Sequence, residues 1–422
     1  MISLAVNSLA TSVSGARLAF GGLRPDDPDT LKKTRSLGQL IASVRDKPIH
    51  IVYVHGMRAD GTGASDPFRK GLCKYVPSLC SLGLPPAKLP SHPLDLGANR
   101  PNATYLELPI WRSDVEWQAS RPFVDRYIYS RQGAAPVIVD EVNWWPLLFP
   151  PKCRFIVHPE IDLSGIDQHH LKLCARSVPP YYPWLTQDEL TKALAHKPIS
   201  AGGARVNAYI KQQIMNWGLT DAVLALGPLR TYFRQAMNLA FDYAAQIDAR
   251  GIDTQEFVVI SESLGSFVVL DAFANIFEDS RAGEAVGERT ADLYFFANQF
   301  ALLQLGRIDE GPAAQTIEGT PRPVPAPERP ASPVDLLRLW ATAGPLEFQG
   351  RPKQVIAFSD PSDLLTYPVP KLRDADGKDV ALVVNVYDRN ESNWFGLFAN
   401  PATAHTGHSA NDDVLKLIFR TR

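Results

Sequence analysis

The chain has 422 residues, 45% of them hydrophobic and 21% charged, which is typical of a soluble protein with a large core. Its 43 Lys and Arg residues are balanced by 45 Asp and Glu residues, so no bulk positive charge favours nucleic acid as a partner. No run of about 18 apolar residues is present, which excludes a membrane-spanning helix on grounds of length. We expect one elaborated domain, because an α/β enzyme with insertions can use this length as a single unit.

The N-terminal segment, residues 1–47, is expected to lie outside this domain. Its first 16 residues are small and mildly apolar but contain no Lys or Arg of the kind that begins a secretory signal. The segment therefore fits either the remnant of an export leader or a disordered start.

Four cysteines form two local pairs, Cys73 with Cys80 and Cys153 with Cys174. This spacing fits two short disulfide loops or four buried thiols. Disulfides would indicate the cell envelope or secretion and thiols the cytoplasm, so the sequence leaves the compartment open.

The main domain, residues 48–422, is predicted to alternate strands with helices. Short β-branched runs predict strands at residues 48–55, 103–108, 257–260, 293–298, 354–358 and 380–387. Apolar spacing predicts one or two helices over residues 205–250 with a break near Gly227-Pro228, a buried helix over 267–277, and a last helix over 411–419 with Asn411 as its N-cap. The fold class predicted is α/β, with a mostly parallel sheet covered by helices on both faces.

Two segments interrupt this alternation. Residues 111–204 lose their periodicity and are rich in aromatic residues and proline, so they are interpreted as a large insertion, either a cover over an acyl pocket or a peripheral loop. Residues 321–333 are dense in proline, which predicts an extended surface loop. Such a loop would also suit a protein that presents a ligand to an aromatic groove.

A nucleophilic serine is predicted at Ser263. An enzyme that uses a serine must expose its oxygen, place a base beside it and supply donors for the oxyanion. The strand at 257–260, the turn Ser261-Glu262-Ser263-Leu264-Gly265 and the helix that follows predict a serine at the apex of a sharp strand-to-helix turn. Gly265 supplies a small residue that this turn needs, whereas Ser261 stands where the usual motif has glycine. The alternative is a polar turn that caps a buried helix.

Two backbone amides are predicted to bind the oxyanion. The amide of Leu264 follows the nucleophile and lies at the start of the helix. The second donor should come from the loop after an earlier strand, where the sequence reads His55-Gly56-Met57. Gly56 permits a close approach of the backbone, so the amide of Met57 is the expected donor.

The acid and the base should follow later strands. Asp360 and Asp363 come after the strand at 354–358; Asp360 precedes proline and suits a turn, so Asp363 is preferred. After the last strand only His405 and His408 remain, and one of them should be the base. The earlier one has more freedom to reach the serine, whereas His408 should contact the last helix or solvent. The order serine, aspartate, histidine is one of the orders that triad enzymes use.

Four motifs together resemble the α/β-hydrolase superfamily, especially its bacterial esterase and lipase-like members. They are the strand ending in His55-Gly56-Met57, the turn Ser261-Glu-Ser263-Leu-Gly265, Asp363-Leu-Leu after a strand, and Ala404-His405-Thr-Gly before a last helix. The resemblance covers roughly residues 48–108 and 205–422. It implies that His405 is the base, because in this family the base usually precedes the last helix.

The expected activity is cleavage of a carboxylic ester, of a small molecule or a lipid, through an acyl-enzyme on Ser263. Acyl transfer, amide cleavage and a binding protein that has lost turnover are the alternatives. No cofactor is needed. A zinc site at His169, His170 and Cys174 is disfavoured, because adjacent histidines point apart and no further ligand has the right spacing. Peripheral contact with a membrane stays open.

Overall fold

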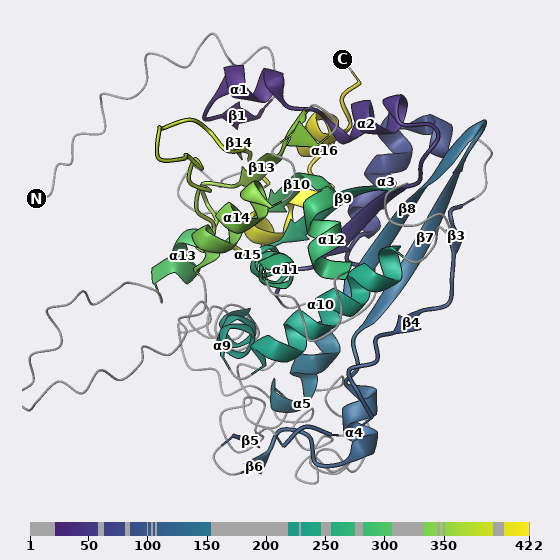
Figure 1. Ribbon diagram of the computed structural model, residues 1–422, viewed down its shortest axis with the longest axis vertical. Coiled ribbons are helices and arrows are strands. Elements are labelled where there is room, and N and C mark those ends of the chain that lie inside the picture. The colour runs from purple at the N-terminus through teal and green to yellow at the C-terminus, as the bar shows by residue number, and fades with distance from the viewer. Residues whose placement is uncertain are drawn as a thin grey trace, which may run out of the picture.

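The computed structural model places a ten-stranded sheet at the centre of the molecule (Figure 1). Its strand order is β1-β14-β13-β10-β9-β2-β8-β7-β3, and β4 pairs with β7. The residues that the structure describes are 22–57, 63–80, 85–98, 100–102, 104–105, 108–152, 218–227, 229–245, 255–274, 282–305, 332–343, 347–348, 351–390 and 401–421.

Six neighbouring strands of this sheet are parallel, and the strands at its edges are antiparallel. The parallel strands are β2 (Ile49–Val54), β8 (Ala134–Asn143), β9 (Glu256–Glu262), β10 (Thr290–Phe296), β13 (Gln354–Ser359) and β14 (Leu382–Tyr387). The antiparallel ones are β1 (Arg24–Pro25), β3 (Ala87–Lys88), β4 (His92–Pro93) and β7 (Phe123–Arg131). The sheet is therefore mostly parallel at its centre, as predicted, and mixed as a whole.

Helices pack on both faces of the sheet, because alternate strand residues point to opposite sides and both sides are apolar. One face is covered by α1 (Pro28–Lys33), α2 (Leu37–Ser43), α3 (Asp66–Tyr75) and α16 (Asp412–Phe419). The other is covered by α9 (Thr220–Leu226), α10 (Arg230–Ala245), α11 (Gly265–Ala274), α12 (Ala282–Arg289), α13 (Phe300–Leu305) and α14 (Pro333–Thr342). The short helices α4 (Asp114–Ala119), α5 (Phe149–Pro151) and α15 (Pro401–Thr406) lie in the connections.

The hairpin of β7 and β8 corrects the prediction that residues 111–204 form an insertion. These two long strands belong to the central sheet, with β8 parallel to β2 and a turn at Gly133, whose φ is +63° (Figure 1). Their apolar pattern is broken by buried charged residues: Arg126 pairs with Asp140, which also lies 3.5 Å from Nδ1 of His50. Residues 153–204 lie outside the described part of the chain.

The N-terminal segment also differs from its prediction, because residues 24–43 are integral to the domain. Strand β1 pairs with β14, and Arg35 forms a 2.7 Å ion pair with Asp292 at the start of β10. Helix α2 packs against α16 in the same core, so no domain boundary lies at residue 48. The start of the segment, residues 1–21, lies outside the described residues.

The predicted strand at 103–108 is also wrong, since β5 (Thr104–Tyr105) and β6 (Leu108–Pro109) form a small separate hairpin. A second two-stranded pair joins β11 (Glu347–Phe348) to β12 (Arg351–Pro352). The other predicted strands and the buried helix are present within a few residues of their expected bounds. The helical segment breaks at Gly227, and Asn411 caps α16 by accepting hydrogen bonds from the amides of Asp413 and Val414.

Cys73, near the end of α3, lies at disulfide-bonding distance from Cys80, which follows that helix; the pair is compatible with the cell envelope or with secretion. The second cysteine pair, His169, His170 and the proline-rich loop up to residue 331 lie outside the described residues. Within the described part of the chain, no helix has the length and apolarity needed to cross a membrane.

Candidate active site

The candidate site lies where the strand order of the sheet reverses. From β2 the chain passes to β8 on one side and then returns to β9 on the other side of β2. In open parallel sheets such a reversal leaves a crevice at the carboxyl ends of the two strands, which is the usual place for a ligand. Here β2 runs into Gly56 and Met57, and β9 runs into Ser263.

Ser263 stands at the apex of a tight turn between β9 and α11. Its φ of +51° is a left-handed conformation that a residue with a side chain rarely adopts. The amide of Ser263 donates a 2.7 Å hydrogen bond to the carbonyl of Phe296 at the end of β10, which holds the turn against the sheet. The serine is 3% exposed and is therefore buried.

Glycine is required at positions 56 and 265, because a side chain at either position would collide with atoms of the neighbouring segment. A Cβ atom at Gly56 would lie 2.7 Å from the Cβ of Ser263, and one at Gly265 would lie 2.7 Å from the carbonyl oxygen of His55. Both distances are well below van der Waals contact. The two glycines therefore allow the end of β2 and the start of α11 to meet.

Ser261, which stands where the usual motif has glycine, fits because its side chain is small and bonded. Its hydroxyl donates a 3.1 Å hydrogen bond to the hydroxyl of Ser266 on the first turn of α11. Both side chains are fully buried. The departure from the motif thus adds a link between β9 and α11.

His405, in the last turn of α15, contacts both of its predicted partners. Its Nε2 lies 2.9 Å from Oγ of Ser263, and its Nδ1 lies 2.7 Å from Oδ2 of Asp363. The three residues come from three separate loops at the carboxyl edge of the sheet. The structure brings together the serine, histidine and aspartate that the sequence singled out.

The carboxylate of Asp363 is held by its own turn. Oδ1 accepts a 2.9 Å hydrogen bond from the amide of Leu365, and Oδ2 accepts one from the hydroxyl of Thr366. Burial alone raises the pKa of Asp363, but the bonds from His405, Thr366 and Leu365 together lower that pKa below its usual value. An ionised carboxylate only accepts, so Nδ1 of His405 carries the ring proton and Nε2 presents its lone pair to the serine.

Asp360, the other candidate acid, closes the turn and does not contact His405. Its two oxygens accept hydrogen bonds from the amides of Ser362, at 2.8 Å, and Asn390, at 2.7 Å. Its backbone carbonyl accepts the amide of Asp363. Asp360 thus shapes the loop that carries Asp363.

His408 is buried, and its carbonyl oxygen accepts a hydrogen bond from the amide of Asn411, the N-cap of α16, so of the two expected positions the contact with the last helix is found and the exposed one is not. Its Nδ1 lies 2.8 Å from Oδ2 of Asp388, a residue that follows β14. Burial lowers the pKa of His408, but the charge and hydrogen bond of Asp388 outweigh it and raise that pKa. Asn411, the N-cap of the last helix, also contacts Asp388, at 3.4 Å. This second histidine–aspartate pair joins the base-bearing loop to α16.

Two backbone amides, those of Leu264 and Met57, lie beside the serine without a hydrogen-bond acceptor among the described residues. Leu264 directly precedes α11, whose ten residues direct the positive end of their dipole toward this turn. Met57 follows Gly56, which contacts the serine. Both predicted donors therefore flank the candidate nucleophile.

Glu141, which the sequence did not single out, holds the far end of the loop that follows Met57. From β8 its carboxylate accepts hydrogen bonds from three successive amides, Gly63 at 2.7 Å, Ala64 at 3.2 Å and Ser65 at 2.9 Å. The hydroxyl of Ser65 donates to it as well. The only sequence signal was an acidic residue inside a β-branched strand, which is unusual because burial of a charge needs partners.

Glu262, the residue before the serine, is hydrogen-bonded to β2. It accepts a hydrogen bond from the hydroxyl of Tyr53 on β2. Burial raises the pKa of Glu262, although the hydrogen bonds of Tyr53 and Ser409 partly oppose this. Glu262 thus fastens the back of the turn to β2.

Within the described residues, no group of three His, Cys, Asp or Glu side chains is placed to hold a metal ion. Comparisons of the chain with protein-family models, with curated proteins and with solved structures gave no match. The chemistry of the site therefore has to be argued from its geometry.

Replacing Gly265 by alanine tests the close approach at the turn. Gly265→Ala should lower the free energy of unfolding by about 1–3 kcal/mol, because the added methyl group meets backbone that cannot move aside cheaply. The double variant Ser261→Ala/Ser266→Ala is the control and should cost about 1 kcal/mol or less, since it removes both partners of the hydroxyl bond and leaves neither of them buried without the other. Chemical denaturation of both variants measures the difference. Equal stability of Gly265→Ala and the wild type would contradict the packing described.

Proposed function

We propose that this protein is a serine hydrolase of the α/β-hydrolase type that cleaves carboxylic esters through an acyl-enzyme on Ser263. The observation that carries the proposal is the position of His405, with Nε2 at 2.9 Å from the serine hydroxyl and Nδ1 at 2.7 Å from the carboxylate of Asp363. Nucleophile, base and orienting acid are the three parts that this chemistry needs. Their meeting at the reversal of a parallel sheet supports the assignment.

In the first step, Oγ of Ser263 attacks the carbonyl carbon of the ester while its proton passes to Nε2 of His405. The imidazolium that forms is stabilised by the ionised Asp363, whose pKa is lowered. The C–O bond to the alcohol then breaks, and the alcohol leaves with the proton from Nε2. The acyl group remains on the serine as an ester.

The second step is hydrolysis of the acyl-enzyme by water. His405 takes a proton from the water, the resulting hydroxide attacks the acyl carbon, and the proton returns to Oγ as the acid leaves. In both steps the amides of Leu264 and Met57 would stabilise the negative oxygen of the tetrahedral intermediate. Their lack of acceptors among the described residues supports this role.

Esters are easier to cleave than amides by this mechanism, because an alcohol is a better leaving group than an amine. Leu264 and Phe267, which follow Ser263 in the chain, belong to the apolar core, and apolar surroundings suit the acyl part of a small-molecule or lipid ester. The cysteine pair at residues 73 and 80 supports action in the cell envelope or outside the cell.

The function is tested by hydrolysis of short-chain aryl esters. Ser263→Ala should lower kcat/KM by about 10⁴-fold or more, as removal of a triad member does elsewhere, with an unchanged thermal unfolding curve. Ser266→Ala, which alters a neighbouring hydroxyl on the same turn, should retain most of the rate. No ester turnover by the wild type, or full turnover by Ser263→Ala, would refute the proposal.

The base is tested by the pH dependence of kcat/KM in the variants His405→Gln and His408→Gln. A general base has to be neutral to accept the serine proton, so the wild-type rate should rise as His405 loses its proton. His405→Gln should remove this rise together with most of the rate. His408→Gln, which can still donate a hydrogen bond to Asp388, should keep the rise. The reverse pattern would show that His408 is the base.

A further inference from the structure

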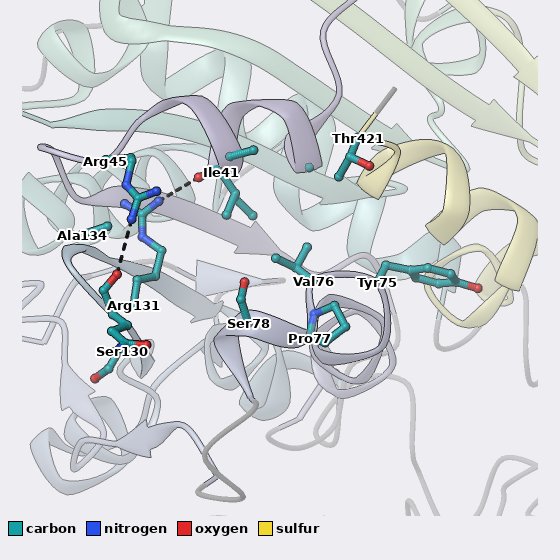
Figure 2. A pocket seen from close by; sticks show the side chains of 13 residues that line it. Ile41, Arg45, Tyr75, Val76, Pro77, Ser78, Ser130, Arg131, Ala134 and Thr421 are labelled. Atoms are coloured by element: carbon teal, nitrogen blue, oxygen red, sulfur yellow. Dashed lines mark hydrogen bonds between the residues drawn. The ribbon is translucent and has the colours of Figure 1, made fainter.

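A separate cavity of about 800 Å³ opens at the other edge of the sheet. It lies between the end of α2, the residues that follow α3, the turn of the β7–β8 hairpin and Thr421 (Figure 2). Strand β8 begins at Ala134, a lining residue, and runs parallel to β2 toward the site of Ser263. The cavity is therefore at the amino edge of the parallel strands, whereas the candidate triad is at the carboxyl edge.

The charge of this cavity is positive. Arg45 and Arg131 both line it, and none of its described lining residues is acidic. Figure 2 shows their side chains next to each other. Burial lowers the pKa of Arg131, and the charge of Arg45 lowers it further. Within the described part of the chain, neither arginine forms an ion pair, and the two like charges lie in the same cavity.

The two arginines differ in their freedom. Arg131 is fixed by backbone carbonyls, with Nε donating to Ala135 and the terminal nitrogens to Ile41 at 2.8 Å, Val44 at 2.6 Å and Lys47 at 3.3 Å. These bonds hold the loop after α2 and explain its position. The exposed Arg45 has one long contact, 3.5 Å from its NH2 group to the carbonyl of Gln132. Its remaining donors have no acceptor among the described residues.

The other lining residues show what a bound molecule would meet. The side chains of Ile41, Val76 and Pro77 give the cavity apolar lining, and Ser130 lines it as well. The volume lies in the range of small-molecule pockets. Two positive charges suit a doubly charged oxyanion better than a carboxylate, and the planar fork of Arg45 suits its oxygens, since the donors of Arg131 bond to backbone carbonyls.

We propose that this cavity binds a small phosphate monoester, with the phosphate at Arg45 and Arg131 and an apolar group against Ile41, Val76 and Pro77. The site is independent of the proposed hydrolase activity. Arg131 would supply a fixed positive charge, and Arg45 would supply the free hydrogen-bond donors. Binding would order the Arg45 side chain between the phosphate and Gln132.

The test is calorimetric titration of the full chain with hexyl phosphate. One molecule should bind per chain, with inorganic phosphate binding more weakly because it lacks the apolar group and hexanol not binding because it lacks the charge. Arg45→Ala should weaken the binding of hexyl phosphate by about tenfold or more. Arg45→Lys should give an intermediate affinity, since lysine keeps the charge but loses the fork.

Two controls separate this site from other binding. Arg338→Ala removes an exposed arginine on α14 and should leave the affinity unchanged. Ser263→Ala should also leave it unchanged, so the result does not depend on the hydrolase proposal. The proposal is overturned by an absence of saturable binding to the wild type, by equal affinity of Arg45→Ala, by equal affinity for inorganic phosphate, or by loss of binding in Ser263→Ala.

Discussion

The close approach of the turn after β9 to the end of β2 is the constraint on which the rest of the site depends. It places Ser263 in a left-handed conformation, which costs about 1–2 kcal/mol for a residue with a side chain. This conformation is maintained because the buried core and the hydrogen bond to Phe296 stabilise the turn. The result is a serine raised over the sheet edge, with the start of α11 and the end of β2 on either side. Every other part of the candidate site is arranged around this position.

The loops at the carboxyl edge are held by acidic residues that perform different tasks. Glu141 holds the loop after β2, Asp360 closes the loop after β13, and Asp388 pairs with His408. A fourth acidic residue, Asp363, contacts His405. Because an anion with several hydrogen bonds resists displacement, these contacts hold the described parts of the loops in place.

Local signals were sufficient for some features and could not reach others. The strand, turn and helix around Ser263, and the N-cap at Asn411, are short-range patterns and were predicted. The choice between His405 and His408, and between Asp360 and Asp363, depends on which side chains meet across 42 residues, and the sequence could only rank them. The pairing of β1 with β14 joins segments near opposite ends of the chain, so no local sequence pattern predicts it. The β7–β8 hairpin was missed because Arg126 and Asp140 interrupt its apolar alternation while neutralising each other in the core.

The central claim, that Ser263 is an activated nucleophile, is tested most directly by reaction with a fluorophosphonate probe and mass spectrometry of the digested protein. The probe reacts with serine only where a base and oxyanion donors activate the hydroxyl. The account predicts one modified peptide, labelled at Ser263, and no labelling after unfolding. Labelling of another serine, or an unmodified Ser263 in the folded protein, would contradict it.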